Sequence, residues 1–324
     1  MADQPTHLPP SELGTKEYWE TFYARTLSHL STRASETSKP AHQASNRENE
    51  NSGEEDADSD ADSDADDDSD PGTSWFSEHN APEKVLDFLT SDDFPLAPAK
   101  TLPSSTSTST GAKWNGKVLD DQPKLLDLGT GNGSMLALLR KKGGYTGEMV
   151  GVDYSRQSVE LARELQKARG HSAYRTDSDE SEDEDGNAPQ SESQTEKEGG
   201  TQIRFEEYDI LSPPPQERLN WFPQANGGFD IVLDKGTFDA ISLSEETVAE
   251  KRVCERYPPV VVGLVRRGGF LVVTSCNWTE EEIVRWFVDG TRGELSIWGR
   301  VEYPRFRFGG KEGQGVCTVC FQRS

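Results

Sequence analysis

The sequence has few hydrophobic residues, few cysteines and no long apolar run. Hydrophobic residues make up 32% of the 324 positions, which is too few for a chain that is folded throughout. Four cysteines in a chain of this length exclude a disulfide-stabilised scaffold. No apolar stretch reaches the roughly 18 residues that a membrane helix needs, and the N-terminus lacks the pattern of a signal peptide. We therefore expect a cytoplasmic or nuclear protein that does not enter a membrane.

The negative charge is concentrated in two segments. The formal net charge is −24, but residues 48–70 carry 13 acidic and no basic residues, and residues 177–198 carry ten acidic residues and one lysine. The remainder has a net charge of −2, so nothing in the composition predicts a nucleic-acid partner. Such segments cannot bury enough apolar surface to fold. We predict acidic disordered insertions at 34–72 and 171–200.

Outside these segments, strand and helix patterns alternate. Five apolar strands that alternate with helices predict a parallel sheet with right-handed crossovers. The last two strands flank a glycine-rich turn and predict an antiparallel hairpin at one sheet edge. The predicted strands are 124–128, 149–152, 203–205, 229–233, 269–274, 301–306 and 315–321, and the predicted helices are 11–30, 75–89, 134–142, 155–169, 245–255 and 280–287.

These patterns predict a Rossmann-like α/β domain with a seven-stranded, mostly parallel sheet. The domain occupies residues 73–324 and contains a flexible Pro/Ser/Thr-rich loop at 97–117. A helical segment at 1–33 precedes it. We expect the protein to be a monomer.

A glycine-rich turn follows the first predicted strand of the domain. Gly129, Gly131 and Gly133 follow Asp127 in a D-x-G-x-G-x-G pattern. Glycines let the backbone approach a ligand closely, and open α/β sheets bind ligands at this end of their strands. Dinucleotide sites have G-x-G-x-x-G, whereas here the third glycine comes one residue earlier and an acid precedes the first. The acid favours a cationic ligand over a diphosphate, and a turn without a ligand is the alternative.

Acidic residues also follow the next three strands. Asp153 lies where an acid can accept hydrogen bonds from both hydroxyls of a ribose, or where it can cap the next helix. Asp209 follows the third strand, and an ordinary turn residue is the alternative for it. Asp234 ends the fourth strand, where it could face a ligand or form a solvated pair with Lys235.

The Cys317-x-x-Cys320 pair has the spacing of a zinc or redox motif. No second cysteine pair or nearby histidine completes a four-ligand site, so we expect no metal. The pair lies in an alternating strand, where residues three apart point to opposite faces. We therefore predict that both cysteines pack in the core.

Five segments together resemble one family. They occur in the order L-G-T-K-E-Y-W-E at 13–20, W-F at 75–76, the glycine turn at 127–133, D-K-G-T-F-D-A at 234–240 and T-S-C-N-W-T at 274–279. The series resembles the class I, seven-β-strand protein-lysine methyltransferases that act on translation elongation factor 1-alpha. The resemblance covers nearly everything outside the acidic segments. The glycine turn is common to many methyltransferases, while the first and fourth segments are more selective.

The resemblance implies S-adenosylmethionine as cofactor and elongation factor 1-alpha as protein substrate. In this family an acid at the position of Asp209 holds the adenine amino group, with an apolar neighbour against the ring. The residues that the resemblance and the motif positions assign to the cofactor are Asp127, Gly129, Gly131, Gly133, Asp153, Tyr154, Asp209, Ile210, Asp234 and Trp75.

Methyl transfer to a lysine amine needs no nucleophile from the enzyme. The enzyme must align the amine with the methyl group and present it neutral, which costs about 4–5 kcal/mol at pH 7. An aromatic channel would lower the amine pKa by desolvation. The candidates for catalytic contacts are Tyr18, Trp19 and Phe238, with Asp234 to orient the amine or the cofactor. Core packing is the alternative for each aromatic residue.

Two other functions remain open from the sequence. The chain could be a class I methyltransferase that acts on another protein or on a small molecule. It could also be a non-catalytic binding module whose acidic segments hold basic partners.

Overall fold

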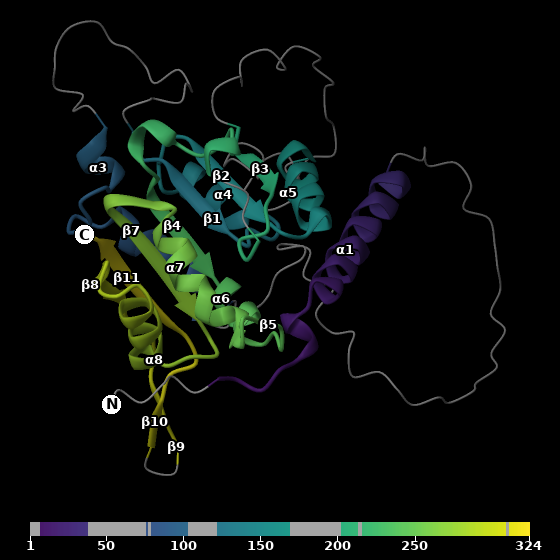
Figure 1. The fold of residues 1–324 in the computed structure, drawn as a ribbon. Coiled ribbons are helices and arrows are strands. Elements are labelled where there is room, and N and C mark those ends of the chain that lie inside the picture. Colours follow the sequence, from purple (N-terminus) through teal and green to yellow (C-terminus); the bar gives the residue numbers. More distant parts are fainter. Residues whose placement is uncertain are drawn as a thin grey trace, which may run out of the picture.

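Seven strands form one sheet in the order β3-β2-β1-β4-β7-β11-β8 (Figure 1). The pairs among β1, β2, β3, β4 and β7 are parallel, and β11 is antiparallel to both β7 and β8. This arrangement confirms the predicted fold class. The strands are β1 Leu125–Leu128, β2 Met149–Asp153, β3 Arg204–Glu207, β4 Phe229–Lys235, β7 Val265–Ser275, β8 Leu295–Val301 and β11 Cys317–Arg323.

The computed structural model describes residues 7–37, 76, 79–102, 122–168, 202–212, 216–308 and 311–324. Nearly all of the predicted acidic insertion at 34–72 and the whole of that at 171–200 lie outside these residues, as does most of the loop predicted at 97–117. Within the described part, no helix is both long and apolar enough to cross a membrane.

The central strands are buried on both faces because helices cover each side. Leu125 belongs to one hydrophobic cluster and Leu126 to another on the opposite face, as strand alternation requires. Cys317 and Cys320 are also divided between the two clusters, and both are buried, as the alternation predicted. The helices are α1 Lys16–Thr37, α2 Ala81–Thr90, α3 Pro98–Thr101, α4 Ser134–Lys141, α5 Arg156–Ala168, α6 Thr237–Ser242, α7 Tyr257–Val262 and α8 Glu280–Val284.

The predicted C-terminal hairpin was partly wrong. The strand expected at 301–306 is β8, which ends at Val301. The glycine-rich segment forms a separate two-stranded sheet of β9 Phe306–Phe308 and β10 Lys311–Gly313. Most side chains of the edge strand β8 are exposed or half-buried, so its sequence carries little apolar alternation.

The helix predicted at 245–255 is absent. Its residues form a small hairpin of β5 Thr247–Val248 and β6 Lys251–Arg252, followed by the 3-10 turn η6 Val253–Arg256. A helix here would have little apolar surface to bury, because most of the segment is charged. Helix α6 was not predicted, and α3 lies inside the predicted flexible loop.

The N-terminal helix also differs in its bounds. A 3-10 turn, η1 Glu12–Gly14, precedes α1, which continues to Thr37 and so runs into the segment predicted as disordered. Helix α2 begins at Ala81, six residues after the predicted start.

Candidate functional site

A cavity of about 280 Å³ lies at the carboxyl ends of β1, β2 and β4. Open parallel sheets bind ligands at this edge. Three groups of segments line it: the glycine turn after β1, the ends of β2 and β3, and the chain from Lys235 to Arg256 after β4. The N-terminal turn and α1 supply the remaining wall through Gly14, Lys16, Trp19, Phe22 and Tyr23.

The backbone conformation of the glycine turn favours glycine, and two of its glycines lie close to neighbouring side chains. Gly129, Gly131 and Gly133 have φ values of 59°, 57° and 76°, which favour glycine. A Cβ on Gly129 would lie 2.2 Å from Oγ1 of Thr237, and one on Gly131 would lie 3.0 Å from the Tyr23 hydroxyl. Gly129 and Gly131 line the cavity, whereas Gly133 precedes α4 and is outside its wall.

Asp127 supports the turn from beneath. Its Oδ2 accepts a 2.7 Å hydrogen bond from Oγ1 of Thr130, and its side chain is buried. Burial raises the pKa of Asp127 to about 6, against the opposing effect of the Thr130 hydrogen bond. Asp127 is not part of the cavity wall.

Asp153 lines the cavity and also joins the glycine turn to α5. Its carboxylate accepts hydrogen bonds from the Gly131 amide at 3.1 Å, the Ser155 amide at 2.9 Å and Oγ of Ser158 at 2.8 Å. Burial raises the pKa of Asp153, and these hydrogen bonds oppose the rise. The ligand-facing and helix-capping interpretations of Asp153 are therefore compatible.

Residues that follow β2 and β3 place an aromatic ring, a carboxylate and an apolar side chain along one side of the cavity. Tyr154, Asp209 and Ile210 all belong to the wall. The Tyr154 hydroxyl donates to the Thr15 carbonyl at 3.2 Å, and this bond ties the N-terminal segment to β2. Asp209 is exposed, and its Oδ1 accepts a 2.9 Å hydrogen bond from the Leu211 amide.

Asp234 does not face the cavity. Its side chain is 1% exposed, and its Oδ1 accepts hydrogen bonds from the Thr237 and Phe238 amides at 2.9 and 3.2 Å. Its Oδ2 accepts the Tyr257 hydroxyl at 2.7 Å. Burial raises the pKa of Asp234 to about 7. The structure thus places it at the start of α6, as an anchor beneath the cavity, and not where the sequence interpretation expected it.

Asp234 also forms no ion pair with Lys235 within the described part of the chain. The Lys235 side chain lines the cavity instead, with Nζ 5.3 Å from the centroid of the Phe76 ring. Phe76 is buried, and its neighbour Trp75 lies outside the described residues.

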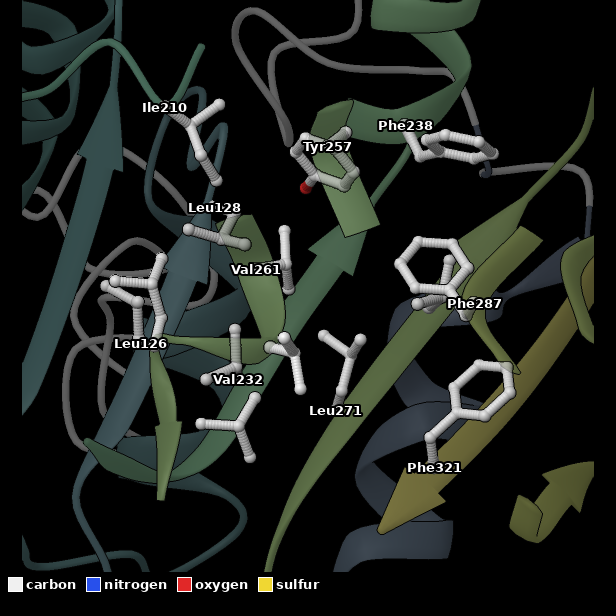
Figure 2. Close-up of a cluster of buried hydrophobic side chains, with 14 of the residues drawn as sticks. Leu126, Leu128, Ile210, Val232, Phe238, Tyr257, Val261, Leu271, Phe287 and Phe321 are labelled. Atoms are coloured by element: carbon white, nitrogen blue, oxygen red, sulfur yellow. The ribbon is translucent and has the colours of Figure 1, made fainter. Parts of the chain in front are cut away.

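Phe238 lies in the hydrophobic core and not in a channel. Its ring centroid is 5.6 Å from that of Tyr257 and 5.1 Å from that of Phe287. Figure 2 shows these three rings among the aliphatic side chains of one sheet face. Phe238 is 1% exposed, so of the two roles predicted for it the structure shows core packing.

Comparison with known proteins gives the same class of protein. A family profile described as a methyltransferase domain matches residues 119–185. The protein-lysine N-methyltransferase EFM4 of Saccharomyces cerevisiae is 29% identical over 97% of this chain and 96% of its own length, and that of Schizosaccharomyces pombe is 26% identical over 97% and 95%. The human EEF1A lysine methyltransferase 2 is 31% identical over 61% of this chain and 65% of its own length.

The chain is thus similar over nearly its whole length to the EFM4 protein-lysine N-methyltransferases, and it contains a match to a methyltransferase domain. Among solved structures, a TehB-like SAM-dependent methyltransferase from Corynebacterium glutamicum aligns over 62% of this chain and 80% of that chain, with 14% identity and a TM-score of 0.36.

Some of the aromatic residues at the start of α1 of this methyltransferase line the cavity, and another lies on the surface of the helix. Trp19 lines the cavity, and its Nε1 donates a 2.8 Å hydrogen bond to the Leu13 carbonyl. Tyr18 is half-buried outside the cavity wall, with its ring stacked 6.3 Å from that of Phe22. Tyr23 is buried and lines the cavity beside Gly131.

Sequence reasoning missed several residues of the wall. Tyr23 lies outside the five motif segments, and Thr237 was placed only in one of them. Nothing in the local sequence distinguished Glu246, which lay in an expected helix, or Arg256, which directly follows that helix.

The position of Gly14 was also unexpected. A Cβ there would lie 2.3 Å from the backbone of Leu243 and of Ser244. Near it, the Ser11 amide donates a 3.0 Å hydrogen bond to the Leu243 carbonyl. The L-G-T-K segment of the methyltransferase is therefore held against the chain that follows α6.

Proposed function

We propose that the enzyme transfers a methyl group from S-adenosylmethionine to the ε-amine of a lysine of translation elongation factor 1-alpha. The observation that carries the proposal is the composition of the cavity wall. Polar groups suited to a nucleoside line one side of the cavity, and the segment that follows β4 lines the other. The acceptor is supported by the names of the relatives, since EFM4 matches this chain over nearly its whole length and the animal proteins are called EEF1A lysine methyltransferases.

The residues present fit S-adenosylmethionine. We assign the ribose to Asp153, the adenine to Tyr154, Asp209 and Ile210, and the methionine part to the glycine turn with Tyr23 and Trp19. The positive φ angles and close contacts of Gly129 and Gly131 form a cradle that any Cβ would obstruct. When bound, the cofactor supplies an electrophilic methyl group, which passes to the amine nitrogen while the carbon–sulfur electron pair stays on sulfur.

The chain must then supply position and desolvation. An ammonium of pKa about 10.4 has to lose its proton to solvent before attack, at a cost of about 4–5 kcal/mol at pH 7. The wall after β4 includes the apolar side chains of Ile241 and Val253, which favour the neutral amine. A restricted cavity also holds the amine and the methyl group in line.

Placement in the structure changes the roles we propose for four residues. Asp127 and Asp234 shape the floor of the site from within the protein, and Phe238 packs beneath α6. Tyr18 supports the aromatic face of α1. Trp19 is the one earlier candidate for an acceptor contact that lines the cavity.

The proposed protein substrate is a translation factor, so we also propose that the enzyme works in the cytoplasm. We retain the proposed division into a helical segment at 1–33, an acidic insertion at 34–72 and a methyltransferase domain at 73–324. We further propose that the enzyme is a monomer that binds its cofactor and acceptor without nucleic acid.

The test is transfer of radiolabelled methyl from S-adenosylmethionine to purified elongation factor 1-alpha. The matched control is Asp209→Ala, because that side chain is exposed and its loss leaves the core intact. We expect label on a lysine of the factor with the wild-type enzyme and a strong reduction with the variant. If the enzyme binds the cofactor but leaves the factor unlabelled, the acceptor is wrong, and labelling of a whole lysate would show whether another protein or a small molecule takes the methyl group.

A further inference from the structure

The wall of the cavity after β4 carries a carboxylate that has no hydrogen-bond or ion-pair partner among the described residues. We propose that Glu246 binds the ammonium group of the target lysine and that the β5–β6 hairpin forms the entry for that side chain. The inference rests on the proposed lysine methyltransferase function and names the part of the site that takes the acceptor.

Sheet order separates this wall from the cofactor side. β2 and β3 lie on one side of β1, and β4 lies on the other. Residues that follow β4 therefore face the cavity from the side opposite Asp153 and Asp209. The wall on that side includes Ile241, Glu246 and Val248. In Figure 1, α6 and β5 lie near the start of α1, where the N-terminal turn borders the same cavity.

Three carboxylates belong to the described cavity wall, and their hydrogen bonding differs. Asp153 accepts three hydrogen bonds, and Asp209 accepts one from the Leu211 amide. The Glu246 carboxylate has neither a hydrogen bond nor an ion pair with any described residue. It is exposed, so an incoming cation can reach it.

The cations of the same wall do not neutralise Glu246. Lys16 lies over the Tyr154 ring, and Lys235 lies over the Phe76 ring. Arg256 lines the cavity without an ion pair to any described residue. Glu246 therefore keeps its carboxylate available for the charge of an incoming ammonium.

The surroundings of Glu246 suit a lysine stem. Ile241, Val248 and Val253 line the cavity beside it. Val248 is 44% exposed and is one of two exposed large hydrophobic residues in the described part of the chain. The four methylene groups of a lysine side chain can pack against these apolar residues while its terminal ammonium reaches the carboxylate.

The hairpin that carries these residues is firmly held. Arg252 donates hydrogen bonds to the carbonyl groups of Ser242 at 3.0 Å, of Ser244 at 3.1 Å and of Leu8 at 2.6 Å. The Glu246 amide donates to Oγ of Ser244 at 3.2 Å. These bonds fix the backbone that carries Glu246 before a substrate arrives.

The turn of the hairpin is conformationally costly. Ala249 and Glu250 have φ values of 52° and 65°, in a two-residue turn where glycine and asparagine are usual. Non-glycine residues in this region are strained, and such strain often occurs at functional sites. The strained turn places Val248 at the entry.

The first test compares Glu246→Gln with Glu245→Gln. Glu245 is the adjacent residue, equally acidic and exposed, but outside the cavity wall. Steady-state kinetics with elongation factor 1-alpha should show a KM for the factor raised roughly 10- to 100-fold in Glu246→Gln, the equivalent of one lost charged hydrogen bond. We expect kcat and cofactor affinity to change by less than about twofold, the control to match the wild type, and Glu246→Asp to recover part of the loss.

Equal KM values for the wild type and Glu246→Gln would overturn the inference while leaving the proposed function intact. If the wild type does not methylate the factor, the proposed acceptor fails, and a second measurement decides the inference. That measurement is titration of the cofactor-loaded enzyme with n-butylammonium, which mimics a lysine side chain. Saturable binding that Glu246→Gln abolishes and Glu245→Gln retains would support the inference, and binding unaffected by Glu246→Gln would overturn it.

Discussion

The Tyr257 hydroxyl donates a 2.7 Å hydrogen bond to the Asp234 carboxylate beneath the floor of the cavity. The other oxygen of Asp234 holds the first amides of α6. At the far end of the same D-K-G-T-F-D segment, buried Asp239 accepts hydrogen bonds from Oγ of Ser275 at 2.6 Å and from the Cys276 amide at 2.8 Å. Both acids of this selective motif thus join the segment after β4 to its neighbours, and the site depends on them for shape.

This burial predicts a pH-dependent stability that Asp234→Asn should remove. The pKa of Asp234 is about 7 in the folded protein against 3.8 for a free side chain. The stability that this raised pKa provides is fully present below pH 4 and is lost as pH rises to 7. Urea unfolding should therefore show that the free energy of unfolding of the variant, relative to that of the wild type, is about 3 kcal/mol higher at pH 8 than at pH 5. A constant difference across that range would contradict a folded-state pKa near 7 for Asp234.

Gly14→Ala should loosen the N-terminal segment without unfolding the domain. The new Cβ would overlap the backbone near Leu243, at a cost of about 1–3 kcal/mol that displacement of the segment relieves. We expect trypsin to cut faster at exposed Lys16 and the Kd for S-adenosylmethionine to rise roughly tenfold. Glu12→Ala, in the same exposed turn, is the control and should behave as the wild type. Unchanged cleavage and affinity in Gly14→Ala would show that the turn adapts to the extra methyl group.

Glu20→Ala should weaken the docking of α1. The Glu20 carboxylate accepts hydrogen bonds from the Arg156 and Gln157 amides at 3.0 and 3.3 Å, and so caps α5 from another helix. Loss of such a cap costs about 1 kcal/mol. The free energy of unfolding from chemical denaturation measures it, with the exposed Glu17→Ala as the comparison. An equal loss in both variants would contradict a specific capping role.

Asp209→Asn should lower cofactor affinity and leave stability unchanged. The amide keeps an oxygen for the Leu211 amide but replaces the second oxygen with a donor, which opposes the adenine amino group. Calorimetric titration should show a Kd for S-adenosylmethionine about tenfold higher. Glu207→Gln, exposed at the end of β3, controls for the lost charge. An unaltered Kd would remove Asp209 from the adenine site.

Strong local patterns predicted most of the sheet. β1, β2 and β4 are apolar runs between turn residues, so their positions in the sequence were correct to within two residues. β8 was misplaced because it is an edge strand that borders β11 on one side only, and its register depends on that partner. The 245–255 segment was misread as a helix because its hairpin is held by hydrogen bonds of Arg252 to carbonyl groups outside the segment, including that of the distant Leu8.

The sequence by itself determined the class of protein, through the order of five short segments. It also determined the glycine turn and the acids at the strand ends, because these depend on residues adjacent in the chain. Only the tertiary structure decided which groups face the cavity. Asp234 and Phe238 both belong to a motif, but their side chains point into the protein. Asp234 caps the first turn of α6, and Phe238 packs the inner face of α6 against the hydrophobic core. Tyr23, Gly14 and Glu246 reach the site from distant segments, and the contacts that bring them there exist only after the chain has folded.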